Sequence, residues 1–166
     1  DDLDNNFNAL TENGKESIFA VQYSNAAENM GGAAFCLAYP HNTGPGGCCG
    51  FYQPSFELVN SFQVDANGLP YLNGEYRTKK SVSVRNSDSS QDAVLAVNDN
   101  NIAVDPRLDF AVGRFGIPYK DWGFPENGWV RDATNGGIFM PKKHVYSSAE
   151  NAAGMKALYG GWAPGS

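Results

Sequence analysis

The sequence lacks the motifs on which common catalytic and metal sites depend. Its two histidines, His41 and His144, do not form the H-E-x-x-H helix motif of zinc proteases. No C-x-x-C pair is present, which argues against a zinc ribbon. A G-x-S-x-G nucleophile elbow and a G-x-x-x-x-G-K-[ST] phosphate loop are also missing. We therefore expect no bound metal and no cofactor.

Cysteine is scarce, with Cys36, Cys48 and Cys49 as the only three. An odd number in a chain of 166 residues does not suit a small fold that is held together by disulfides. The neighbours Cys48 and Cys49 could bridge each other only through a strained ring. We therefore expect buried, unreactive thiols without a redox role.

Long apolar runs and clusters of basic residues are missing too. No stretch approaches the roughly 20 apolar residues of a membrane helix. The net charge is −6: residues 1–76 hold nine acids and one base (−8), and the remainder holds nine acids and eleven bases (+2). A nucleic-acid binder needs a basic stripe that replaces phosphate counterions. The basic residues that come closest to one are scattered: Lys79, Lys80, Arg85, Lys142 and Lys143. We do not expect nucleic acid as a partner.

Aromatic residues, by contrast, make up 13% of the chain and occur together with 19 glycines and 9 prolines. Glycine and proline divide a chain into turns and loops. The composition predicts an irregular α+β body with short helices, short strands and long loops, in which aromatic side chains supply much of the buried area.

The predicted regular elements are few. The β-branched and aromatic runs predict strands, and apolar residues at a spacing of three predict a helix after Pro54. The expected strands are Glu16–Tyr23, Ala33–Tyr39, a stretch from Phe110 to Phe115, and Gly137–Tyr146. The expected helices are Gln53–Phe62 and 147–159, the latter capped by Ser147 or Ser148 with Glu150 nearby. Between them, 73–103 reads as a surface excursion with one or two short strands or a helical turn.

Asp65-Ala66-Asn67-Gly68 predicts a tight turn, because Asn-Gly readily takes positive φ. The same residues resemble the start of a calcium loop, but the bidentate glutamate at the required spacing is missing. We favour the hairpin turn.

The aromatic residues of two loops are candidate ligand contacts. Sugars present C–H faces that pack on aromatic rings, and their hydroxyl groups bond to polar side chains and backbone groups. The candidates are Tyr39, Phe51 and Tyr52 in the first loop and Tyr119, Trp122 and Trp129 in the second. Burial of the same rings in a core that is poor in aliphatic residues is the competing interpretation.

An acid pair near the second loop leaves a catalytic alternative open. Glycosidases use two carboxylates that flank the sugar bond. Asp121 and Glu126 lie close to Trp122 and Trp129 in the sequence. Solvated surface acids are much commoner than catalytic ones, so we expect a binding protein rather than an enzyme.

The order of the landmarks resembles the middle of SusD/RagB family proteins. Each motif is weak by itself, but the series in the right order is fairly specific. The segments that carry the resemblance are ENGKESIFAVQYS (Glu12–Ser24), YQPSFELVNSF (Tyr52–Phe62), VDANGLP (Val64–Pro70), VDPRLDFAVGRFGIPY (Val104–Tyr119) and GIFMPKKHVY (Gly137–Tyr146).

The resemblance implies a mainly α-helical superhelix of TPR-type repeats for a full-length family member. Residues 1–166 would form one SusD-like segment, the irregular α+β portion that packs against the superhelix. A lipid-anchor cysteine and the helical repeats would precede Asp1, and a long C-terminal helix would follow Ser166.

In function, the resemblance implies a lipid-anchored protein of the outer-membrane surface. It would bind oligo- or polysaccharides and deliver them to a TonB-dependent (SusC-like) transporter. Two alternatives stay open: capture of peptides or proteins by a member of the same family, and a glycoside hydrolase fragment. Arg107 of the D-P-R-L motif is expected to be structural, pairing with a carboxylate or capping carbonyl groups.

Overall fold

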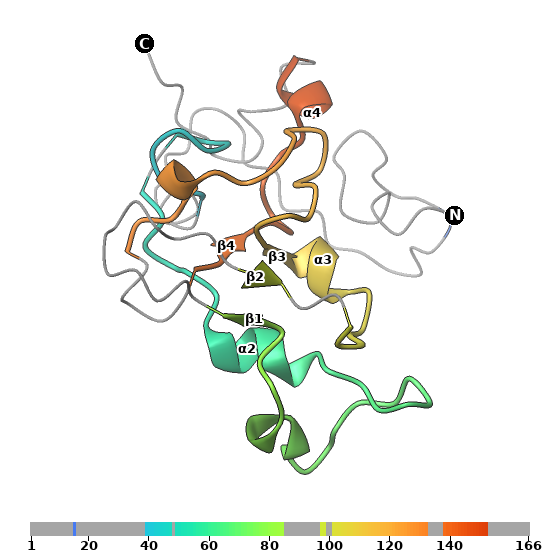
Figure 1. Ribbon diagram of the computed structural model, residues 1–166. Coiled ribbons are helices and arrows are strands. Elements are labelled where there is room, and N and C mark those ends of the chain that lie inside the picture. Colours follow the sequence, from blue (N-terminus) through green and yellow to red (C-terminus); the bar gives the residue numbers. More distant parts are fainter. Residues whose placement is uncertain are drawn as a thin grey trace.

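The structure of the protein is a computed structural model that describes residues 15, 39–47, 49–84, 97–98, 101–132 and 138–152. In these ranges the regular elements are short and the connections between them are long, as Figure 1 shows. The elements are α2 (Phe56–Ser61), the 3-10 helix η4 (Glu75–Thr78), β1 (Ser83–Val84), β2 (Val97–Asn98), α3 (Leu108–Ala111), β3 (Val112–Gly113), the 3-10 helix η5 (Asn127–Trp129), β4 (Met140–Pro141) and α4 (Ser148–Ala152). This is the irregular α+β segment that the composition predicts.

Helix α2 confirms the helix predicted after Pro54, although it begins later than Gln53. Ser55 caps it, because its side chain accepts a hydrogen bond from the Leu58 amide at 3.1 Å. Val59 is fully buried, and the ring of Phe56 meets that of Phe139 edge to face at 5.1 Å between centroids. The helix is therefore held to the core by one face.

The turn predicted at Asp65–Gly68 is confirmed. The amide of Gly68 donates to the carbonyl of Asp65 at 3.0 Å, and that of Asp65 donates to the carbonyl of Leu69 at 2.9 Å. The Asp65 carboxylate accepts hydrogen bonds from the amides of Asn67 and Leu69. Both amides donate to the same carboxylate oxygen, Oδ1, so the Asp65 side chain stabilises the turn, in agreement with the hairpin interpretation.

The strand predicted from Phe110 to Phe115 is wrong in its first part, because Phe110 lies in helix α3. The turn at Asp105-Pro106 starts that helix, since the amide of Leu108 donates to the carbonyl of Asp105 at 3.0 Å. Only Val112 and Gly113 are extended, as β3. Arg107 donates from its backbone and its side chain to the Asp105 carboxylate, which is the structural role that we expected.

The strand predicted over Gly137–Tyr146 is wrong in its length. Only Met140 and Pro141 are extended, as β4, and they pair antiparallel with β3 (Val112 with Pro141, Gly113 with Met140). Pro141 cannot donate to a ladder, and the chain turns directly after it, where the amide of Val145 donates to the carbonyl of Lys142 at 3.1 Å.

The other predicted elements agree where the structure describes them. The 73–103 excursion contains η4 and the antiparallel pair β1–β2, which joins Ser83 with Asn98 and Val84 with Val97. Ser147 caps α4, as discussed below. The predicted strand Glu16–Tyr23 lies outside the described residues, and so does the predicted strand Ala33–Tyr39 apart from Tyr39.

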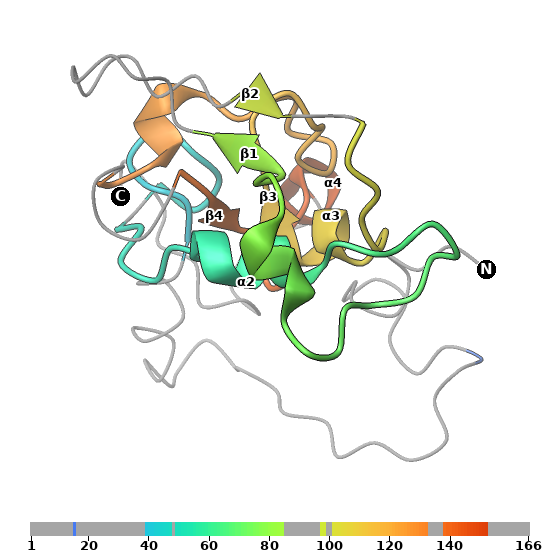
Figure 2. The ribbon, with the colours of Figure 1, turned by 60° about the horizontal axis from the view of Figure 1, so that its bottom comes forward.

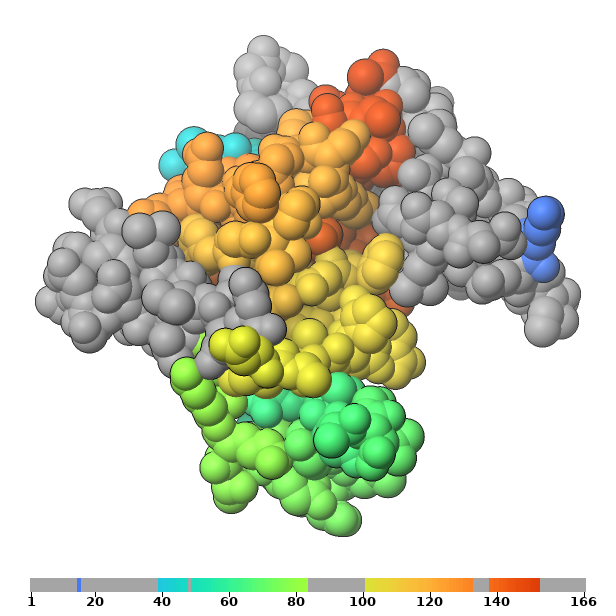
Figure 3. Space-filling view, turned by 45° about the vertical axis from the view of Figure 1, so that its right-hand side comes forward, coloured from blue at the N-terminus to red at the C-terminus, as the bar shows by residue number. Residues whose placement is uncertain are grey.

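The core lies between α2, α3 and the β3–β4 pair (Figures 1 and 2). The green segment that follows α2 and contains η4 extends away from the core at the bottom of Figure 3. In the ranges described, no helix combines the length and hydrophobicity that a membrane crossing requires. The buried apolar side chains are Tyr39, Val59, Val82, Leu108, Val112, Phe115, Tyr119, Trp129, Val130, Ile138, Phe139, Met140, Val145 and Tyr146.

Candidate ligand-binding surface

The two aromatic loops, residues 39–53 and 119–132, lie against each other. The amide of His41 donates to the carbonyl of Trp129 at 2.8 Å. The Gln53 side chain donates to the carbonyl of Asp132 at 3.1 Å and accepts from the Asp132 amide at 2.9 Å. In Figure 1 the first loop, in cyan, runs beside η5, in orange. Six candidate residues far apart in the sequence are therefore brought into one region.

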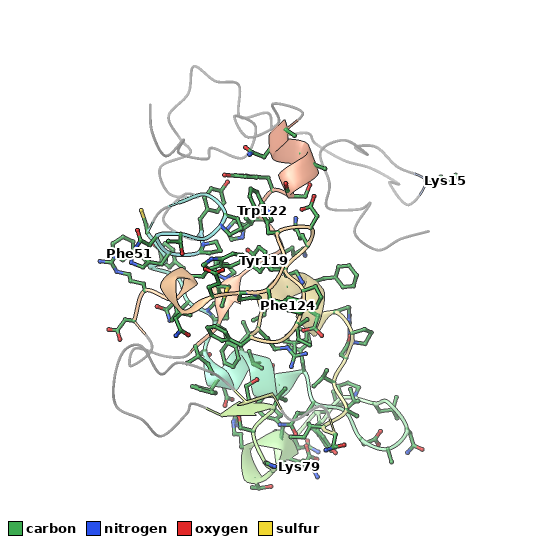
Figure 4. All side chains as sticks on the ribbon, turned by 45° about the horizontal axis from the view of Figure 1, so that its top comes forward. Lys15, Phe51, Lys79, Tyr119, Trp122 and Phe124 are labelled. Atoms are coloured by element: carbon green, nitrogen blue, oxygen red, sulfur yellow. The ribbon has the colours of Figure 1, made fainter. Side chains whose placement is uncertain are left out.

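Three of the six candidates are packed inside this region. Tyr39, Tyr119 and Trp129 are buried, and the rings of Tyr119 and Trp129 meet edge to face at 5.3 Å. The Tyr119 hydroxyl donates to the carbonyl of Pro141, and burial raises its pKa well above the usual value of 10.0. Figure 4 shows Tyr119 in the middle of the body and Phe51 at its edge. These three rings therefore pack the core and do not present a face to solvent on which a sugar could stack.

Trp122 is half-buried and anchored at its polar end. Its indole N–H donates to the carbonyl of Tyr146 at 2.9 Å, and its ring approaches that of Tyr146 at 6.0 Å. A tryptophan that is held in this way has a fixed orientation but shows only part of its ring to solvent.

Phe51 and Tyr52 are the two candidates that the structure exposes. Phe51 is 53% exposed and Tyr52 is 63% exposed. In the described ranges, no residue hydrogen-bonds to the Tyr52 hydroxyl. Two consecutive rings are therefore accessible to solvent, and an exposed ring can accept the C–H face of a sugar.

Arg131 is part of this surface and was not among the predicted residues. Its guanidinium carbon lies 3.9 Å from the centre of the Phe51 ring, in cation–π geometry. Its Nη1 also donates to the carbonyl of Cys49 at 3.1 Å, across 82 positions of sequence. No local motif marks such a partner, so sequence reasoning had no signal for it.

The backbone at residues 49–50 makes this close approach possible. Cys49 has a φ of 95° and Gly50 has a φ of 58°. A Cβ atom on Gly50 would lie 2.9 Å from the Cβ of His41 and 3.1 Å from that of Arg131, so only glycine fits here. Cys49 is disulfide-bonded, so the prediction of a free thiol is wrong for this residue. The other two cysteines lie outside the described residues.

One acid of the catalytic alternative, Asp121, is held by hydrogen bonds from helix α4. The two carboxylate oxygens of Asp121 accept from the amides of Ser148 and Ala149, at 2.6 and 2.8 Å. Asp121 thus stabilises the first turn of α4, and both acids are exposed to solvent. Across the described part of the chain, no three His, Cys, Asp or Glu side chains are grouped to hold a metal ion.

Comparison with protein families identifies the chain. The model of the SusD family matches residues 15–160 of the chain, which confirms the resemblance seen in the ordered motifs. Among curated proteins, none matches the chain.

Proposed function

Because the chain belongs to the SusD family, whose members are nutrient-binding proteins of the cell surface, we propose that this protein captures glycans without cleaving them. It delivers them to a TonB-dependent, SusC-like transporter in the outer membrane. A lipid anchor outside residues 1–166 attaches it to that membrane. The family match supports the class of protein, and the surface at Phe51 and Tyr52 supports a place for the ligand.

The exposed ring pair is the observation that carries this proposal. Large aromatic side chains are usually well buried, so two consecutive rings in solvent favour a binding role. The loop that presents them is pinned to the second loop by the Gln53–Asp132 hydrogen bonds. A platform that is already ordered loses little conformational entropy when a ligand binds.

Isothermal titration calorimetry of the full-length protein against a panel of glycans tests the proposal. Alanine at a central aromatic contact typically weakens binding roughly 10- to 30-fold. We expect losses of that size for Phe51→Ala and Tyr52→Ala. Phe124→Ala is the matched control, because Phe124 is 60% exposed but lies apart from Phe51, as Figure 4 shows. Wild-type affinity in both ring variants would reject this surface as the site.

The alternatives give different results in the same assay. If the protein binds peptides but no glycan on the panel, it is a peptide-capture member of the family. Release of shortened glycans, lost in a variant that changes both Asp121 and Glu126, would show a hydrolase. We expect each bound glycan to be recovered intact.

A further inference from the structure

Arg131 differs from every other arginine that the structure describes. Three of them form ion pairs: Arg77 with Glu57, Arg107 with Asp105, and Arg114 with Asp109. In the described part of the chain, no carboxylate pairs with Arg131. In a protein with a net charge of −6, no carboxylate among the described residues neutralises this cation beside the exposed Phe51 ring.

The guanidinium of Arg131 is nevertheless held in place. The Phe51 ring covers one of its faces at 3.9 Å, and the carbonyl of Cys49 accepts from one nitrogen at 3.1 Å. A guanidinium has five N–H donors in a rigid fork, so donors remain for a ligand. That fork matches the two oxygens of a carboxylate or a sulfate better than it matches a hydroxyl group.

We propose that the glycan recognised here is acidic, with a carboxylate or sulfate oxygen pair bound by Arg131 while a sugar ring packs on Phe51 and Tyr52. This rests on the proposed function and adds the substrate class. The local cation also offsets the overall negative charge, whose long-range effect is screened beyond about 10 Å at 0.1 M salt.

Calorimetry of the full-length protein with paired ligands tests the charge requirement. One pair is oligogalacturonides and their fully methyl-esterified forms, which share a backbone and differ in charge. The other is a sulfated galactan oligosaccharide and its desulfated form. We expect the charged member of one pair to bind at least tenfold more tightly, and that pair identifies the anion as carboxylate or sulfate. Binding of the charged member should weaken as NaCl is added.

Variants of Arg131 then test the residue. A charge-assisted hydrogen bond contributes roughly 10- to 100-fold to affinity, so Arg131→Gln should lose that much for the charged ligand alone. Arg131→Lys keeps the positive charge but not the fork of N–H donors. Its affinity for the charged ligand should lie between those of the wild type and Arg131→Gln. Lys79→Gln is the control, because Lys79 also lies over a ring, that of Tyr71 at 4.8 Å, away from the aromatic loops. Unchanged affinity of Lys79→Gln is expected.

The possible failures can be told apart. One outcome is that neutral glycans bind as well as acidic ones, and that Tyr52→Ala weakens their binding while Arg131→Gln does not. This outcome overturns the acidic specificity, but the capture function stands. If no glycan binds, charged or neutral, the proposed function fails and this inference fails with it. If the glycan affinity of the wild-type protein changes neither with esterification or desulfation of the ligand nor with salt, the inference is overturned. This result does not depend on the stability of any variant.

Discussion

Gln53 and Asp132, which are 79 positions apart, exchange two hydrogen bonds in which a side-chain amide takes the place of a backbone peptide. The contact imitates one rung of an antiparallel ladder. These hydrogen bonds join the loop that contains Phe51 to the segment that contains Arg131. The exposed surface is therefore supported by a contact that is itself partly buried.

Replacement of Gln53 by alanine should destabilise the protein by about 1–3 kcal/mol, because both hydrogen bonds are lost and the backbone groups of Asp132 stay partly buried. Urea unfolding measures this change. Glycan affinity should fall as well, although Gln53 carries no ring. As a control, Leu72→Ala removes a side chain that is 86% exposed and should stay within about 0.5 kcal/mol of wild type. Equal stability of the two variants would contradict the supporting role.

Two glycines at positive φ, one in open space and one against a ring, allow the cost of backbone strain to be measured apart from the cost of steric crowding. Gly68 has a φ of 79° and open space where a Cβ would be, so Gly68→Ala should cost about 1–2 kcal/mol from the left-handed conformation alone. Gly46 has a φ of 88°, and its Cβ would lie 2.3 Å from a Tyr39 ring atom. Overpacking adds about 1–3 kcal/mol, so Gly46→Ala should be clearly the less stable variant in thermal or urea unfolding. Similar losses at the two positions would mean that the Tyr39 ring moves aside freely.

Ser147 and Glu150 form a reciprocal cap at the start of α4. The Ser147 hydroxyl accepts from the Glu150 amide at 3.0 Å, and the Glu150 carboxylate accepts from the Ser147 amide at 2.6 Å. Ser147→Ala should cost about 1 kcal/mol in urea unfolding. Ser148→Ala is the same change one residue later and leaves the reciprocal cap intact, so it should cost clearly less. The prediction fails if the two variants unfold alike.

The Asp105–Arg107 pair predicts a pH dependence. Hydrogen bonds from Arg107 lower the pKa of Asp105 from 3.8 to about 2. Because the folded pKa is the lower one, the stabilisation is complete above the unfolded value of about 3.9 and is lost as the pH falls through about 2. NMR titration of the Asp105 carboxyl carbon should show this pKa and its return toward 3.8 in Arg107→Gln.

Arg77→Gln provides the control for that titration, because it breaks the other exposed ion pair, with Glu57. The pKa of Asp105 should not change in this variant. A shift of the same size in both variants would mean that general charge, rather than the contact with Arg107, sets the value.

Residues that act on near neighbours were the ones that the sequence predicted well. The turn at Asp65–Gly68, the Ser147 cap and the position of Arg107 each depend on groups within a few positions. Two predicted strands were wrong because local turn signals outweighed the apolar pattern. The β-branched and aromatic runs near Phe110 and Tyr146 predict extended strands, but the turn at Asp105-Pro106 starts a helix and the chain turns after Pro141.

By itself, then, the sequence determined the family, the irregular α+β character and the local turns and caps, since these follow from the order of motifs and from short-range hydrogen bonding. The tertiary structure alone decided that Tyr39, Tyr119 and Trp129 are buried while Phe51 and Tyr52 are exposed, and that Arg131 lies over Phe51. An aromatic residue looks the same in the sequence whether it packs or binds. Its burial depends on side chains brought together from distant parts of the chain, and no local pattern records them.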